Sequence, residues 1–308
     1  MTTNAIQSSH IYSTYFAPRG RSRIYTLGMQ IAQLYLSPFD QIIGFIGEAG
    51  SGKSVLIKGM FPGIELTNDD DGVNVRPLPL LEQEYETGFF TPHTYHLDIR
   101  FETGFHQLSE LADGVRLAVR RGKRIIIEHF DLIYPLLGVN ANLLIGVGEQ
   151  IVITRPNLFG PLPQELCDIV YPSLAYRLMA HSAEDLCEYA MTQEQMLACS
   201  HGDIRHGFVL EFNEHQPDID IPTLEARVNE LIRQDLPIDY YDESHILLGG
   251  AQHYCTGPRT HVRSTGRIIG FRLLDHFIYD HFHKTYMLVG CVGDDSEENI
   301  RKLETIHG

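Results

Sequence analysis

The stretch Gln41–Ser54, QIIGFIGEAGSGKS, carries the strongest structural signal in the chain. Its first part, Gln41–Ile46, is an apolar run that predicts a buried strand leading directly into a glycine-rich loop. The loop matches the pattern GxxxxGK[ST] completely, and chance would produce such a match in roughly one chain in a hundred of this length. A strand, this loop and then a helix predict a phosphate loop that binds a nucleoside triphosphate, namely ATP with magnesium.

Each part of this loop has a chemical role in the predicted site. The glycines let backbone N–H groups turn towards the phosphates, which also meet the positive end of the following helix. Lys53 would neutralise the β- and γ-phosphates and so assist catalysis, and the Ser54 hydroxyl would bind Mg²⁺. The residues expected to contact the nucleotide are Gly47, Glu48, Ala49, Gly50, Ser51, Gly52, Lys53, Ser54 and Val55.

A magnesium site also needs a carboxylate at the end of a strand. Asp98 closes the strand-like TYHLD, and Glu128 closes the apolar run RIIIE, so these two acids are the candidates. The alternative is that either acid is a solvated strand end. The acidic tripeptide Asp69–Asp71 could also reach the metal, although an acidic turn ending in Gly72 explains it better.

Apolar periodicity extends the α/β pattern on both sides of the loop. Residues 24–36 and 108–119 carry apolar side chains at helical spacing. The runs Arg124–Glu128 and Gln150–Thr154 are typical of strands covered on both faces. Strands alternating with helices predict an α/β domain of the P-loop NTPase type with a mainly parallel sheet, over residues 1–170.

The pattern changes near Asn157–Pro163, where NLFGPLP interrupts the alternation. A helical stretch at residues 186–196, a strand-like Gly207–Phe212 and a helix between Pro222 and Pro237 follow, and then short β-like runs among glycines. This order predicts a second, α+β domain over residues 171–308.

Length and composition restrict the class of protein. The chain has 308 residues, enough for two domains that each bury a core. Its net charge of -16 disfavours broad, nonspecific nucleic-acid binding but leaves room for recognition of a tRNA end in a pocket. Five cysteines without disulfide-scaffold spacing, the lack of a secretory signal and the lack of a run of ~20 apolar residues predict a cytoplasmic protein with no membrane role.

Five segments of the first half occur in an order that resembles a known family. The order of IYTLGMQIAQLYL, IIGFIGEAGSGKSVLIKGM, VRPLPLLEQEYE, YHLDIRFE and RIIIEHFD is similar to that of the small bacterial ATPase that assists threonylcarbamoyladenosine synthesis on tRNA. The resemblance covers about residues 24–135 and implies that Asp98 and Glu128 are the magnesium and catalytic carboxylates. Two departures are RPLP at Arg76–Pro79, where that family has a switch threonine, and Ile99–Phe101 in place of LYR.

Four segments of the second half resemble the editing domains of threonyl- and alanyl-tRNA synthetases. They are HSAEDLCEYA, HGDIRHGFVLEF, IPTLEARVNELIRQDLPI and CTGPRTHVRSTGRIIGF, in the family's order over about residues 178–275. In that family HxxxH on a helix and CxxxH on a loop bind one zinc ion beside a pocket for the aminoacyl end of tRNA.

The resemblance implies zinc ligands in this chain. The matching positions are His181, Asp185, Cys255 and His261. His245 and His253 could substitute as ligands, although an ordinary loop residue explains either of them better. Asp185 stands where the family has its second histidine, and two extra residues separate the cysteine from the following histidine. An intact zinc site and a degenerate site kept for its pocket both remain open.

Three functions are compatible with the sequence. The leading hypothesis is an ATPase whose nucleotide state controls an editing-like domain that binds aminoacyl-tRNA or a related aminoacyl compound, with a metal that activates water for ester cleavage or only orients the ligand. Deacylation is downhill, so ATP would serve as a switch. The alternatives are an ATP-dependent kinase or ligase of a small amino-acid-like substrate, and a nonenzymatic ATP-sensing regulator of a partner protein.

Overall fold

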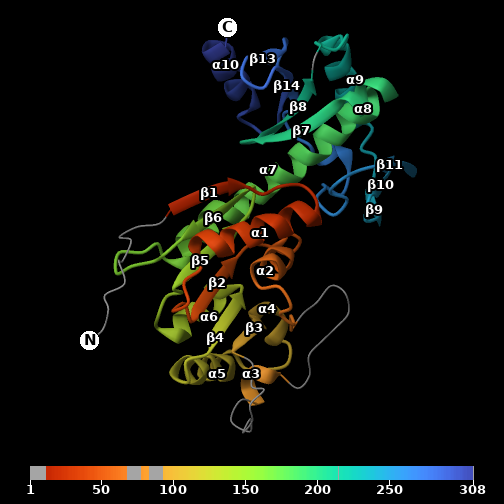
Figure 1. Ribbon diagram of the computed structural model, residues 1–308. Helices are drawn as coiled ribbons and strands as arrows, with labels where there is room; N and C mark the ends of the chain where they lie inside the picture. Colours follow the sequence, from red (N-terminus) through yellow and green to blue (C-terminus); the bar gives the residue numbers. More distant parts are fainter. Residues whose placement is uncertain (1–11, 68–77, 83–92, 214, 308) are drawn as a thin grey trace. The chain divides into compact units, whose positions relative to one another are not determined.

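The computed structural model divides into two compact units (Figure 1). The first unit contains Arg21–Tyr171 and the described residues up to Ala17, and the second contains Pro18–Gly20 and the described residues from Pro172 onwards. The division falls inside the long helix α7 (Pro163–Ala190), beside the boundary expected after residue 170. The described residues are 12–67, 78–82, 93–213 and 215–307.

A six-stranded mixed sheet forms the centre of the first unit. Its strand order is β1-β6-β5-β2-β4-β3. Strands β5, β2, β4 and β3 run parallel, whereas β6 and β1 extend the sheet through antiparallel pairs. The prediction of an α/β class with a mainly parallel sheet is therefore confirmed. The strands are β1 (Tyr12–Phe16), β2 (Ile42–Ile46), β3 (Thr94–Asp98), β4 (Arg124–Glu128), β5 (Leu143–Val147) and β6 (Gln150–Thr154). The helices are α1 (Arg21–Tyr35), α2 (Lys53–Met60), α3 (Pro79–Glu82), α4 (Ile99–Glu102), α5 (Leu108–Arg120) and α6 (Phe130–Leu137).

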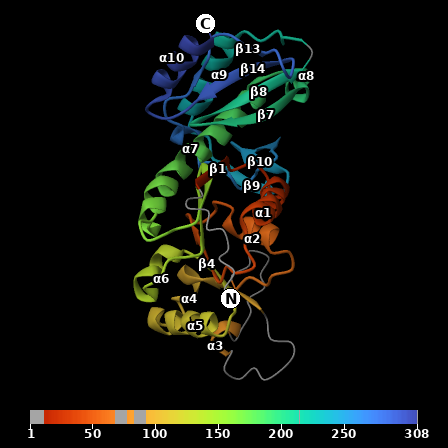
Figure 2. The same cartoon turned by 60° about the vertical axis from the view of Figure 1, so that its left-hand side comes forward.

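The central strand β2 shows why helices cover both faces of this sheet. All five of its residues are buried, and successive side chains point to opposite faces. Ile42 and Ile46 share a core with residues of α5, α6 and α7, whereas Ile43 and Phe45 share another with α1 and α2. In Figure 2, α6 and the pair α1 and α2 accordingly lie on opposite sides of β4. The parallel strands therefore read as apolar runs rather than as an alternating pattern.

The second unit contains two antiparallel sheets. One has the order β11-β10-β9, and the other has β12-β14-β8-β7 with β13 paired to β14. One core joins Leu186 of α7, Phe208 of β8, Val228 of α9 and Ile246 of β10. The strands are β7 (Cys199–Ile204), β8 (Gly207–Asn213), β9 (Ile238–Asp242), β10 (His245–Leu248), β11 (Ala251–Tyr254), β12 (Arg272–Leu273), β13 (Ile278–Asp280) and β14 (Thr285–Cys291). The helices are α8 (Gln193–Ala198), α9 (Ile221–Arg233), the 3₁₀ turn η1 (Thr265–Arg267) and α10 (Ser296–His307).

The helical stretch expected at residues 186–196 is two helices. α7 ends at Ala190, and Thr192 begins α8 through a capping box with Gln195. The Thr192 hydroxyl accepts from the Gln195 backbone N–H, and the Gln195 side chain accepts from the Thr192 N–H. Such a box satisfies backbone donors at a helix start, which explains why the periodicity does not continue as one helix.

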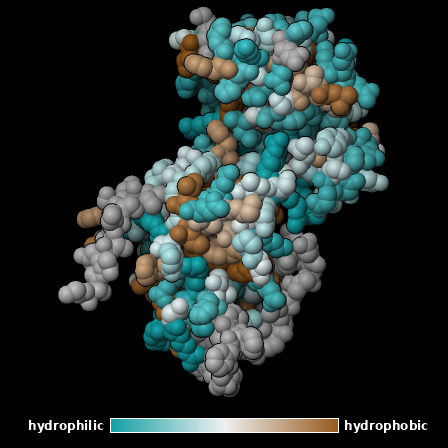
Figure 3. All heavy atoms as spheres, in the orientation of Figure 1, coloured by the Kyte–Doolittle hydropathy of each residue, from teal (hydrophilic) through white to brown (hydrophobic). Residues whose placement is uncertain are grey.

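The surface carries both hydrophobic and hydrophilic side chains. On the face drawn in Figure 3, hydrophobic residues are scattered among hydrophilic ones. Among the described residues, no helix combines the length and the apolar character needed to span a bilayer.

Candidate functional site

The glycine-rich loop of the first unit, Gly47–Gly52, joins β2 to α2 as the sequence predicts. Gly52 takes the N-cap position of α2 with a φ of 93°, a backbone conformation that costs glycine little and other residues more. The loop therefore turns sharply and directs the N-terminus of α2, which begins with Lys53 and Ser54, towards the sheet edge. Helix N-termini with free N–H groups attract anions.

Lys53 places a cation inside this loop. Its Nζ donates to the carbonyl oxygens of Gly47 and Glu48, each at 2.9 Å, and lies 3.7 Å from Oε2 of Glu128. Burial lowers the pKa of Lys53, and the negative charges of Glu128 and Asp98 oppose this shift. The ammonium group is thus held at the centre of the loop by weak acceptors that a phosphate could replace.

The expected carboxylates, Asp98 and Glu128, lie side by side. They end adjacent parallel strands and are partners in the β3–β4 register, while Phe45 of β2 is the partner of Glu128 on its other side. Because β2 leads into the glycine-rich loop, both acids and the loop share one edge of the sheet. Asp98 also caps α4 by accepting from the Phe101 N–H at 3.1 Å.

Glu128 is the point where the side chains of this edge meet. Its Oε1 accepts from the Ser54 hydroxyl at 3.2 Å and lies 3.1 Å from Nε2 of His96. Burial alone raises the pKa of Glu128, but the hydrogen bond from His96 and the positive charge of Lys53 outweigh it and lower the pKa below its usual value. Glu128 is therefore an ionised acceptor at neutral pH.

His96 was not predicted as a site residue. Its Nδ1 accepts from the Thr67 backbone N–H at 3.1 Å, so the ring proton is on Nε2 and is donated to Glu128. The Thr67 hydroxyl in turn accepts from the Asp98 N–H at 3.3 Å. The sequence signal was the pair His96 and Asp98, because residues two apart on a strand point to the same face.

Two further residues near this edge were also missed. Arg100 Nη1 donates to Glu48 of the loop at 3.0 Å. His129 follows Glu128 with a φ of 56°, and burial together with the charges of Lys53 and Arg100 lowers its pKa to about 4. The expected candidate Asp69–Asp71 and the first two residues of the expected switch, Arg76 and Pro77, lie outside the described residues.

Replacing His96 with Ala tests whether it positions Glu128. We expect the rate of ATP hydrolysis at saturating ATP to fall about 10- to 100-fold with ATP affinity unchanged, as when the partner of a functional carboxylate is removed. His96→Gln, which can still donate to Glu128, should recover part of the rate. Equal loss in both variants, or loss of ATP affinity alone, would contradict this role.

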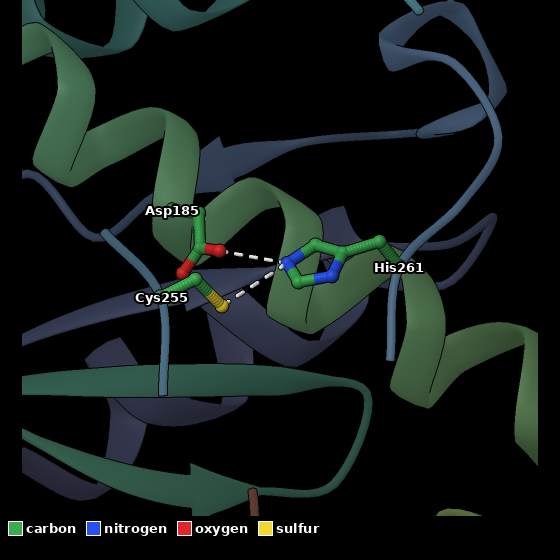
Figure 4. Close-up of side chains that lie close together, drawn as sticks. All are labelled: Asp185, Cys255 and His261. Atoms are coloured by element: carbon green, nitrogen blue, oxygen red, sulfur yellow. Dashed lines mark hydrogen bonds and ion pairs between the residues drawn. The ribbon is translucent and has the colours of Figure 1, made fainter. Parts of the chain in front are cut away.

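In the second unit, three of the four expected zinc ligands lie together, as Figure 4 shows. Nε2 of His261 is 2.7 Å from Oδ2 of Asp185 and 3.7 Å from Sγ of Cys255. Asp185 comes from α7, and the other two come from the segment after β11. The fourth residue, His181, is not in this group and lies 3.5 Å from Asp203. Burial lowers the pKa of His181 to about 3, so its ring is neutral.

A cation from the chain already occupies this group. Arg19, which is 2% exposed, donates through Nη1 to Glu184 and through Nη2 to Asp185 and to the Cys255 sulfur, the last at 3.3 Å. The neighbouring Gly20 lets the backbone beside Arg19 lie close to Thr256, because a Cβ at position 20 would lie 2.6 Å from the Thr256 carbonyl oxygen. No motif or periodicity connects Arg19 with this site in the sequence.

Arg19 divides its charge between two buried acids. Burial alone raises the pKa of Asp185, but Arg19 and the hydrogen bond with His261 hold it far below its usual value. Burial also raises the pKa of Glu184, and although Arg19 opposes this, the charge of Asp185 adds to it, so that the pKa reaches about 7. The single positive charge of Arg19 thus fully compensates the negative charge of Asp185 but not that of Glu184 as well.

A zinc ion at Asp185 would therefore compete with Arg19. Zinc would need the Asp185 carboxylate and the Cys255 sulfur, both of which accept from the guanidinium, and two cations at this spacing repel. Asp185, Cys255 and His261 are a group of metal-ligand type, but the positive charge there is supplied by Arg19.

Replacing Arg19 with Ala is expected to destabilise the second unit by about 3–5 kcal/mol, because Asp185 and Glu184 lose the cation that compensates them. Hydrogen–deuterium exchange of peptides covering residues 179–188 should rise accordingly. Arg23→Ala, at an exposed position on α1, is the control and should change nothing. Unchanged protection in the Arg19 variant would show that its ion pairs contribute little.

The comparisons with known proteins add no assignment to these sites: no protein-family model matches the chain, and no curated protein is significantly similar to it.

Proposed function

We propose that the first unit is a magnesium-dependent P-loop ATPase and that its nucleotide state controls the second unit, an editing-like domain that binds aminoacyl-tRNA or a related aminoacyl compound. The observation that carries the ATPase proposal is the convergence of Lys53 and Ser54 on Glu128, beside Asp98. A phosphate-binding loop, a lysine, a hydroxyl and two strand-end carboxylates are the parts that phosphoryl transfer to water requires.

The residues of the first unit fit ATP with magnesium. The bound Mg²⁺ would neutralise charge on the β- and γ-phosphate oxygens. Ser54 and Asp98 would hold it, and Lys53 would exchange the Gly47 and Glu48 carbonyls for phosphate oxygens. Glu128, ionised and oriented by His96, would accept a hydrogen bond from the attacking water and position it.

The proposal for the second unit rests on the ordered resemblance to editing domains and on its buried acids. An aminoacyl ester carries an α-ammonium group. This group is a cation, as is the Arg19 guanidinium that Asp185 and Glu184 already bind. We infer that the aminoacyl ligand competes with Arg19 for these carboxylates. Because Arg19 supplies the cation at this group, the proposed function of the second unit includes no metal-dependent ester cleavage.

Steady-state ATP hydrolysis by the purified full-length chain tests the proposal. We expect ADP and phosphate as products and a faster rate with aminoacylated bulk tRNA than with deacylated tRNA. A phosphorylated or adenylated small molecule would instead establish a kinase or ligase. Tight ATP binding with almost no turnover under any condition would establish a nonenzymatic sensor.

A further inference from the structure

A second group of metal-ligand side chains lies in the second unit, apart from the Asp185 group. It consists of Glu188 near the end of α7 and of Cys199 and His201 on β7. Their ligand atoms all lie within 4.8 Å of one another. Sγ of Cys199 is 3.6 Å from Oε1 of Glu188, and Nε2 of His201 bonds the same oxygen. Three side chains from two elements therefore point to one spot.

A fourth side chain, His253 of β11, faces this group. It is 8% exposed, and its Nε2 lies 4.0 Å from Oε2 of Glu188, beyond hydrogen-bond distance. Among the described residues this nitrogen has no hydrogen-bond partner. The edge-on contact with Tyr189, at 5.7 Å between ring centroids, helps to fix the ring. A buried ring nitrogen aimed at a carboxylate without a partner calls for a ligand.

We propose that Glu188, Cys199, His201 and His253 form a site for one zinc ion. One thiolate, two imidazoles and one carboxylate are the donors that zinc takes in tetrahedral sites, whereas magnesium and calcium prefer oxygen donors alone. A thiolate and a carboxylate together balance the charge of Zn²⁺. The ion would complete the coordination of His253 and draw the four groups around one centre.

This site is distinct from the one that holds Arg19. Glu188 lies one helical turn beyond Glu184 on α7, and neither Glu188 nor Cys199 bonds the guanidinium. Charges of the neighbouring group, those of Glu184, Asp185 and Arg19, act on His201 and His253, and Arg19 is paired with both acids. A divalent ion at Glu188 therefore does not have to displace Arg19.

The positions of the four ligands indicate a structural role. β7 lies at one edge of the larger sheet, and β11 lies at one edge of the smaller one. An ion at this position would join both edges to the end of α7. Four protein ligands leave no open position for water, which is the pattern of structural zinc rather than catalytic zinc.

Zinc content and affinity of the full-length chain test the proposal. After purification with added Zn²⁺ and dialysis, the wild-type protein should retain one zinc per chain. Cys199→Ala and His253→Gln should each lower the affinity for zinc at least about 100-fold, measured in competition with a chromophoric chelator. Removing a ligand should lower the affinity at least as much as removing a residue that hydrogen-bonds a ligand. Cys255→Ala is the matched control and should keep the ion.

Cobalt substitution gives a second readout. The wild-type chain with Co²⁺ should show a thiolate charge-transfer band that Cys199→Ala loses and Cys255→Ala keeps. Chelation should lower the melting temperature of the wild-type protein but leave that of the folded His253→Gln variant unchanged. The proposal fails if the wild-type chain retains no zinc, or if Cys255→Ala loses the ion and Cys199→Ala keeps it. ATP hydrolysis enters none of these readouts, so the zinc site and the ATPase proposal stand or fall separately.

Discussion

Replacing Glu128 with Gln is expected to lower the rate of ATP hydrolysis about 10²- to 10⁴-fold while ATP binding is retained. The amide has nearly the same size and can still accept from His96 and Ser54, which both bond Oε1. It removes the negative charge that would orient and activate the attacking water, and with it the ion pair between Oε2 and Lys53. Single-turnover hydrolysis and equilibrium binding of ATP, measured on the same preparation, separate the two effects.

The control for this substitution is Glu110→Gln, which removes an exposed acid from α5 of the same unit. It should leave both the rate and the affinity unchanged. If Glu128→Gln hydrolysed ATP at the wild-type rate, Glu128 would not act on the water, and Asp98 would become the remaining candidate for that role.

Replacing Lys53 with Ala is expected to abolish measurable ATP binding, a loss of at least about 100-fold. Lys53 is the cation that the loop holds between Gly47 and Glu128, and a charge-assisted hydrogen bond contributes about 1.5–3 kcal/mol. Two such bonds to phosphate oxygens would account for this loss. Fluorescence titration with a labelled ATP analogue measures the effect.

Lys58→Ala, in the last turn of the same helix, is the matched control and should bind ATP as the wild-type protein does. Circular dichroism and the melting temperature would show whether each variant is folded. Wild-type affinity in a folded Lys53→Ala variant would mean that the glycine-rich loop does not hold the phosphates.

The sequence predicts the strand, the loop and the helix of residues 41–60 well because their signals are local. A glycine-rich loop between a buried strand and a helix can adopt few conformations. Residues 41–54 contain the strand, the loop and the start of the helix in this order. Asp98 and Glu128 could be placed because the carboxyl ends of adjacent parallel strands meet at one edge of the sheet. His96 was missed, although it lies two residues before Asp98 on the same strand face.

The second unit could be predicted less completely because its clusters are assembled by tertiary structure. Arg19 is 166 residues from Asp185 in sequence, and no periodicity or motif connects the two. His181 and Asp185 are four apart on α7, which favours a shared metal, yet His181 is paired with Asp203 of β7. Cys199 and His201 did carry a signal, since residues two apart on a strand face the same way.

Calorimetric titration of the full-length chain with ATP and Mg²⁺ tests the central claim most directly. We predict that one nucleotide binds per chain, with a dissociation constant between roughly 1 μM and 1 mM, the usual range of KM values for enzymes. The heat of binding should be lost in Lys53→Ala. No binding by the folded wild-type chain at ATP concentrations up to about 10 mM, ten times the top of that range, would contradict the account.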